Sequence, residues 1–187
     1  METFNDYVEA HSKLITFDAQ KSIDDLFITL DSKLNSNSIV YTVGNGGSHS
    51  TAEHFSADLN LNFKRTGNSI KSICASSQIA SYTALANDFS FESALAFYLE
   101  NFIQEKDILI VFTASGNSEN ILRAISMAIK HNSIIYAFSG FSGGKVLTLS
   151  GIRNIHIPSQ DGLYGEIENL HLMICHYIID KLKGQGH

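Results

Sequence analysis

Two pairs of side chains able to bind metal or move protons recur at helical spacing in this 187-residue sequence. His54 and Asp58 are four residues apart, so a helix places both on one face. Glu168 and His176 share a face of a later helical run, about 12 Å apart along its axis. Two imidazoles and two carboxylates are suitable donors for a tetrahedral zinc site. The same groups suit an acid–base pair, so both chemistries stay open.

Two loops rich in glycine and hydroxyl groups indicate a second chemistry. The loop Gly44-Asn45-Gly46-Gly47-Ser48 ends the apolar run 39–43, and Thr113-Ala114-Ser115-Gly116-Asn117-Ser118 ends the apolar run 108–112. A strand that passes through such a loop into a helix presents backbone amides and hydroxyls to a phosphate. Neither loop fits the Walker or the dinucleotide-binding glycine pattern. We therefore expect a phosphorylated ligand held between the two loops.

Strands and helices alternate along the chain and must position these residues. We expect strands over 39–43, 69–75, 108–112, 134–138 and 152–157, and helices within 1–35 and over 48–61, 78–86, 91–103, 119–130 and 164–183. The apolar, non-alternating strands indicate a parallel sheet covered by helices on both faces. The prediction is an α/β protein, a three-layer α/β/α sandwich that forms a single domain over 1–187 with an N-terminal helical extension over 1–35. The two loops should meet at the carboxyl ends of their strands.

Three local expectations accompany this arrangement. Ser48 is expected to cap the helix after the first loop. Asn87 and Asp88 are expected in the break between two helices, as a turn and cap or as contacts to sugar hydroxyls. His171 is three residues from Glu168, and we interpret it as a histidine of the surface or of a subunit contact.

Composition excludes several classes of function. The 44% hydrophobic and 17% charged residues suit a compact protein. The net charge is −6, and the sequence has no cluster of Lys and Arg residues of the kind that binds nucleic acid. No apolar run approaches the roughly 20 residues of a membrane span. Polar and acidic residues follow Met1 where a signal peptide would be apolar, so we expect a cytoplasmic protein. Cys74 and Cys175 lack metal-binding or redox spacing.

With these motifs the whole chain resembles the SIS-domain phosphosugar isomerases, in particular the phosphoheptose isomerases. The matching segments are Gly44-Asn45-Gly46-Gly47-Ser48-His49, the helix with His54, Asn87-Asp88-Phe89, Ser115-Gly116-Asn117-Ser118 and the helix with His171 and His176. The resemblance implies a flavodoxin-like SIS fold and a homotetramer with active sites at subunit interfaces. It implies interconversion of sedoheptulose 7-phosphate and D-glycero-D-manno-heptose 7-phosphate through an enediol, for cell-surface polysaccharide synthesis.

The resemblance also implies roles for individual residues. Asp58 would move the carbon-bound proton, and His176 would handle the oxygen protons. One Zn²⁺ per subunit would be bound by His54, Asp58, Glu168 and His176. The residues implied to contact the sugar phosphate are Asn45, Gly46, Gly47, Ser48, Asp58, Asn87, Asp88, Thr113, Ala114, Ser115, Ser118 and Glu168.

The chain departs from the family pattern at two of these positions. A proton-transferring glutamate of the family is matched by Asp58, and a glutamine by Glu168. A displacement of about 1 Å at Asp58 would cost on the order of a hundredfold in rate. One alternative is therefore a phosphosugar-binding or regulatory SIS protein without catalysis, of the type that associates with replication initiators. Another is an isomerase for a different phosphosugar, such as one used in capsule.

Overall fold

A five-stranded parallel sheet forms the centre of the protein. The computed structural model describes residues 3–184, apart from the side chains of residues 62–66. The strands are β1 (Ile39–Val43), β2 (Lys71–Cys74), β3 (Ile108–Thr113), β4 (Ile134–Ser139) and β5 (Arg153–His156), in the order β2-β1-β3-β4-β5. All strands expected from the sequence are present, with ends shifted by a few residues at most.

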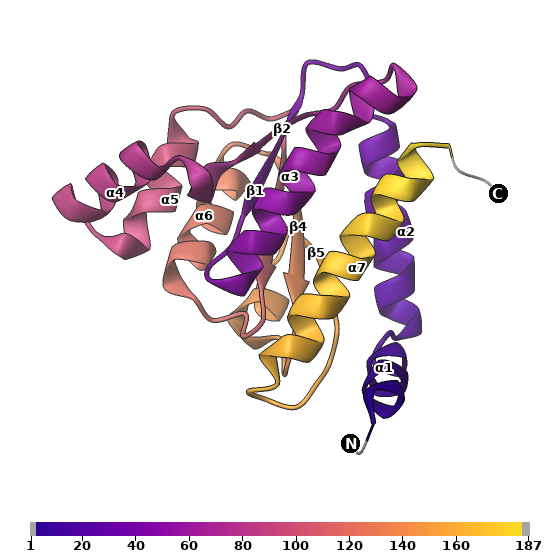
Figure 1. The fold of residues 1–187 in the computed structure, drawn as a ribbon. Helices are drawn as coiled ribbons and strands as arrows, with labels where there is room; N and C mark the ends of the chain where they lie inside the picture. Colours follow the sequence, from indigo (N-terminus) through magenta and orange to yellow (C-terminus); the bar gives the residue numbers. More distant parts are fainter. Residues whose placement is uncertain (1–2, 185–187) are drawn as a thin grey trace.

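Helices cover both faces of the sheet and confirm the predicted three-layer α/β/α architecture (Figure 1). One face carries α2 (Phe17–Asp31), α3 (Gly47–Thr66) and α7 (Tyr164–Leu182), and the other carries α5 (Phe91–Glu100) and α6 (Glu119–Lys130). The remaining elements are α1 (Phe4–Ser12), α4 (Ile79–Asp88), η1 (Ala75–Ser77) and η2 (Gly144–Thr148). None of the helices in the described part of the chain is both long and apolar enough to span a bilayer.

The central position of β3 in the sheet explains why this strand is apolar from Ile108 to Phe112. Ile108, Ile110 and Phe112 pack into the core beneath α2, α3 and α7. Leu109 and Val111 point the other way and pack beneath α5 and α6. All five side chains are fully buried. A strand covered on both faces needs apolar residues throughout, as the sequence predicted.

The strand order places the two polar loops at the same point of the sheet. After β1 the chain goes outward to the edge strand β2, and then returns to pair β3 with the other side of β1. The strand order therefore reverses between β1 and β3. In open α/β sheets, ligands bind beyond the carboxyl ends of the strands at such a switch point. The loops after β1 and β3 both lie there.

Two local expectations are corrected. Helix α3 begins at Gly47, so Ser48 lies inside the first turn and does not cap it. Gly46 adopts φ +55°, and its carbonyl accepts hydrogen bonds from the amides of His49 and Ser50, which starts the helix earlier. Asn87 and Asp88 form the last turn of α4. The break follows them, because the Ser90 hydroxyl accepts the Ser93 amide at 3.2 Å and caps α5.

Candidate active site

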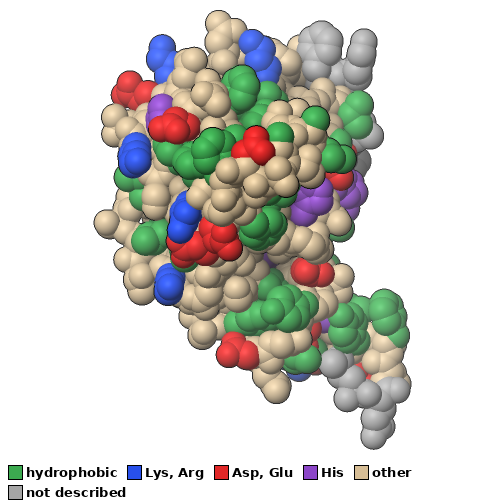
Figure 2. Space-filling model, turned by 90° about the vertical axis from the view of Figure 1, so that its left-hand side faces the viewer, with side chains coloured by type: hydrophobic (Ala, Val, Ile, Leu, Met, Phe, Trp, Pro, Cys, Tyr) green, Lys and Arg blue, Asp and Glu red, His purple; other side chains and the backbone are tan. Residues whose placement is uncertain are grey.

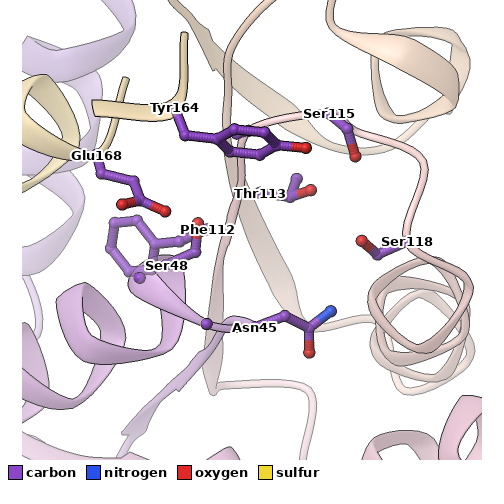
Figure 3. Close-up of a pocket in the computed structure, with 11 residues that line it drawn as sticks. Asn45, Ser48, Phe112, Thr113, Ser115, Ser118, Tyr164 and Glu168 are labelled. Carbon is purple, nitrogen blue, oxygen red and sulfur yellow. The ribbon is translucent and has the colours of Figure 1, made fainter. Parts of the chain in front are cut away.

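The loops after β1 and β3 enclose one cavity of about 290 Å³ at the carboxyl edge of the sheet. In Figure 3 the hydroxyls of Ser115 and Ser118 point into it from one side, and Glu168 lies opposite. The cavity is lined by Asn45, Gly46, Gly47, Ser48, Phe112, Thr113, Ala114, Ser115, Ser118, Tyr164 and Glu168. Converging hydroxyls and backbone amides at a helix N-terminus form an anion-binding end.

The loop after β3 is shaped by a glycine that no other residue replaces easily. Gly116 adopts φ +65°, and a Cβ atom there would overlap the carbonyl of Gly143. The Gly116 amide donates to the Thr113 hydroxyl at 3.1 Å, which closes the turn. Ser118 is the N-cap residue of α6, but its hydroxyl makes no capping hydrogen bond. That hydroxyl is therefore available to a ligand in the cavity.

The loop after β1 is tied to α6 by a pair of amide side chains that sequence reasoning missed. The side-chain Nδ2 of Asn45 donates to Oδ1 of Asn120 at 2.9 Å, and Nδ2 of Asn120 donates to Oδ1 of Asn45 at 2.8 Å. Asn120 is 1% exposed, although a polar residue early in an amphipathic helix suggests a solvent-facing position. Phe112 and Tyr164 were also missed. Tyr164 did carry a signal, because it is four residues before Glu168 and shares its helix face.

Three of the four expected metal ligands come together where α3 and α7 pack side by side (Figure 1). The Nε2 atom of His54 lies 3.5 Å from Oδ2 of Asp58 and 3.4 Å from Nε2 of His176. A tetrahedron with bonds of about 2.0–2.1 Å separates its donors by about 3.3–3.4 Å. The donor set therefore fits a three-ligand zinc site that keeps one position open, as catalytic zinc sites do.

Other contacts around this cluster qualify its chemistry. Without a metal, His54 Nε2 can hydrogen-bond to only one of its two partners, Asp58 or His176, at a time, because a single imidazole nitrogen either donates or accepts. The neighbouring Cys175 thiol is fully buried, and burial, reinforced by the charge of Asp58, raises its pKa well above its usual value. Cys175 therefore stays protonated and is a poor metal ligand.

Glu168 is not part of this cluster. Its carboxylate packs against Gly47 at the start of α3, where a Cβ atom would overlap it, and it lines the cavity between the two loops. A metal-binding role for Glu168 stays a prediction. Asn87 and Asp88 lie outside the cavity, exposed at the end of α4, where the Asn87 amide donates to Asp88 Oδ1 at 3.0 Å.

His171 is a core residue, which makes the surface interpretation wrong. It is 0% exposed and packs against Phe112 and Phe138, with ring centroids 6.1 and 5.4 Å apart. It belongs to the face of α7 that also buries Ile167 and Ile174 against the sheet. Burial lowers the pKa of His171 to about 4, so the imidazole is neutral.

Comparisons with known proteins agree with this fold. A family model described as "SIS domain" matches residues 3–140. The chain belongs to the SIS domain family. This SIS protein is 32% identical over 184 residues to a phosphoheptose isomerase from Helicobacter hepaticus. The aligned residues make up 97% of this chain and 90% of that protein. The resemblance inferred from the motifs is confirmed.

Solved structures support the same family and fold. A phosphoheptose isomerase from Francisella tularensis superposes with a TM-score of 0.84 at 28% identity, covering 97% of this chain and 96% of that one. A phosphoheptose isomerase from Neisseria gonorrhoeae superposes with a TM-score of 0.78, covering 94% of this chain and 90% of that one. Because its sequence identity is 20%, this second structure supports the fold alone. These relatives support a role as a phosphosugar isomerase.

Proposed function

We propose that this SIS protein is an aldose–ketose isomerase that interconverts sedoheptulose 7-phosphate and D-glycero-D-manno-heptose 7-phosphate, or a closely related pair. One observation carries the proposal: both hydroxyl-rich loops line a single cavity whose opposite wall holds a carboxylate. Such a cavity offers an anion-binding end and a proton-transfer end. The reaction would take place in the cytoplasm and supply heptose for a cell-surface polysaccharide.

The phosphate is proposed to bind at the end formed by the loop after β3. Thr113, Ser115 and Ser118 offer hydroxyls there, and α6 begins directly after its N-cap residue Ser118, with its positive dipole end turned to the ligand. Asn45, held by Asn120, lies beside this end and is proposed to bind a sugar hydroxyl. A chain with a net charge of −6 needs such local recognition to hold an anion.

We propose that His54, Asp58 and His176 hold a zinc ion. The support is the spacing of their donor atoms, which matches a tetrahedral site. When bound, zinc would polarise a sugar oxygen. Asp58 and His176 are the proposed acid–base pair on this side of the site, where they would exchange protons with the sugar.

We also propose the homotetramer, with active sites at subunit interfaces. A groove of about 820 Å³ between α1 and α7 has His176 in its wall. Its wall also includes Phe4, Val8 and Met173, which are 78%, 50% and 58% exposed. Figure 2 shows hydrophobic side chains gathered at the protruding N-terminal end of the molecule. Neighbouring subunits would cover this surface and bring Asn87 and Asp88 to a second subunit's cavity.

Turnover of sedoheptulose 7-phosphate with and without added zinc tests the proposal. Asp58→Asn should abolish turnover while phosphosugar binding remains, because the phosphate loops are untouched. Asp31→Asn, exposed at the end of α2, is the matched control and should behave as wild type. Full activity of Asp58→Asn would refute the role of Asp58. Binding without turnover by the wild-type protein would favour the regulatory alternative, and turnover of another ketose phosphate alone would favour the capsule-type isomerase.

A further inference from the structure

The cavity between the two loops offers hydroxyl groups to an anion but no basic side chain. None of the described residues that line it is Lys, Arg or His. The Thr113 hydroxyl accepts the Gly116 amide at 3.1 Å, and the Ser115 hydroxyl accepts a neighbouring amide at 3.3 Å. Each of these hydroxyls therefore keeps its proton for a ligand. A phosphate group has three strong acceptor oxygens, which can accept more hydrogen bonds than the three hydroxyls of this loop can donate.

One further hydroxyl reaches this end of the cavity from α7. Tyr164 is the first residue of α7, one turn before Glu168, and it lines the same cavity. Its ring extends across the cavity from the side of Glu168, with the hydroxyl pointing toward Ser115 (Figure 3). That hydroxyl forms no hydrogen bond with any residue that the structure describes. The phenol is therefore an additional donor that faces the loop after β3 from the opposite wall.

A buried ring holds Tyr164 in this direction. Phe141 is 6% exposed and packs edge-to-face on the Tyr164 ring, with ring centroids 5.0 Å apart. Phe141 is itself fixed, because its amide donates to the Ser159 hydroxyl at 3.2 Å and its carbonyl accepts the Ser159 amide at 3.3 Å. Tyr164 is 53% exposed. The contact with Phe141 therefore orients the tyrosine ring and leaves its hydroxyl accessible.

The Tyr164 ring also separates the cavity from a space that disfavours phosphate. A second hollow of about 230 Å³ adjoins the first, and Tyr164 and Ser115 line both. Asp161 lines the second hollow, and its negative charge repels an anion. A phosphate is therefore favoured on the side of the Tyr164 ring that faces Thr113.

We propose that Tyr164 is a phosphate-binding residue whose hydroxyl donates a hydrogen bond to a phosphate oxygen. The assignment rests on the proposed function, in which a phosphosugar occupies this cavity. The loop after β3 and the first residue of α7 then hold the phosphate from two sides. Isomerisation leaves the phosphate unchanged, so this contact is equally strong in the ground state and in the transition state. It therefore lowers KM and leaves kcat unaffected.

Isothermal titration calorimetry of the wild-type protein and Tyr164→Phe tests the assignment. The probes are sedoheptulose 7-phosphate and, by competition, inorganic phosphate. Phenylalanine keeps the ring against Phe141 and removes only the hydroxyl. We expect the Kd of both probes to rise about tenfold, the loss typical of one hydrogen bond to a charged group. KM should rise by the same factor, with kcat within about twofold of wild type.

The matched control is Tyr98→Phe, which removes a tyrosine hydroxyl from α5, outside the cavity wall. It should keep the wild-type Kd for both probes. Unchanged Kd values in Tyr164→Phe would overturn the assignment. Weaker binding of the sugar phosphate alone would also overturn it, because the hydroxyl would then contact the sugar. A lower kcat at unchanged Kd would overturn it as well, since it would place the hydroxyl at the reacting carbons.

The same measurements separate this assignment from the proposed isomerase function. A wild-type protein that binds both probes without turnover would refute the isomerase, while the Kd comparison would still decide the role of Tyr164. A wild-type protein that binds no inorganic phosphate would refute the anion-binding end of the cavity, and the assignment of Tyr164 with it.

Discussion

Acidification is expected to destabilise this protein through one buried histidine. His171 is fully buried, and both of its ring nitrogens lack hydrogen-bond partners among the described residues. Burial lowers its pKa from 6.5 to about 4, while the backbone of Ser139 opposes the shift without reaching hydrogen-bonding geometry. Below pH 6.5 the unfolded chain binds a proton that the folded protein excludes. Stability is therefore lost as the pH falls from 6.5 toward 4, and this residue contributes no pH dependence above that window.

The size of the effect follows from the pKa difference. One pKa unit corresponds to about 1.4 kcal/mol, so the full shift is worth about 3 kcal/mol below pH 4. Between pH 7 and pH 5 the contribution of His171 to the free energy of unfolding is about 2 kcal/mol. Because His171 is buried, solvent screens little of this penalty.

Urea unfolding of the wild-type protein and His171→Phe measures this contribution. Phenylalanine keeps an aromatic ring against Phe112 and Phe138 and removes the titrating nitrogens. Measurements at pH 8 give the packing effect of the substitution alone, since histidine is then neutral in both states. With EDTA present in all samples, wild type should lose about 2 kcal/mol more than the variant between pH 7 and pH 5. Equal losses in both proteins would refute the reasoning.

Two further substitutions test the loops of the cavity. Gly116→Ala should lower the free energy of unfolding by about 1–3 kcal/mol, because it strains a positive-φ residue and adds a Cβ that overlaps the Gly143 carbonyl. Thermal unfolding measures this loss, and an unchanged Tm would contradict the prediction. Asn120→Ala removes both hydrogen bonds to Asn45 and should cost about 1–3 kcal/mol. It should also raise KM for the phosphosugar, and a wild-type KM would show that the pair does not position the first loop.

Local patterns in the sequence predicted the strands and the meeting of the two polar loops at one edge of the sheet. The runs 39–43 and 108–112 are apolar or β-branched at every position because β1 and β3 are covered by helices on both faces. Turn and cap details were less predictable. Ser48 resembled a cap, but the positive φ of Gly46 started α3 earlier. His171 was misread although Ile167 and Ile174, four residues before it and three after it, place it on the apolar face of its helix.

The sequence by itself determined which residues share a helix face, because the period of a helix is a local property. It therefore placed His54 with Asp58, and Glu168 with His176. Only the tertiary structure decided which levels of α3 and α7 lie opposite each other, since that depends on the packing of apolar side chains such as Phe55 and Ile178 in a shared core. This packing joins His176 to His54 across 122 residues of sequence and leaves Glu168 in the cavity, two turns away.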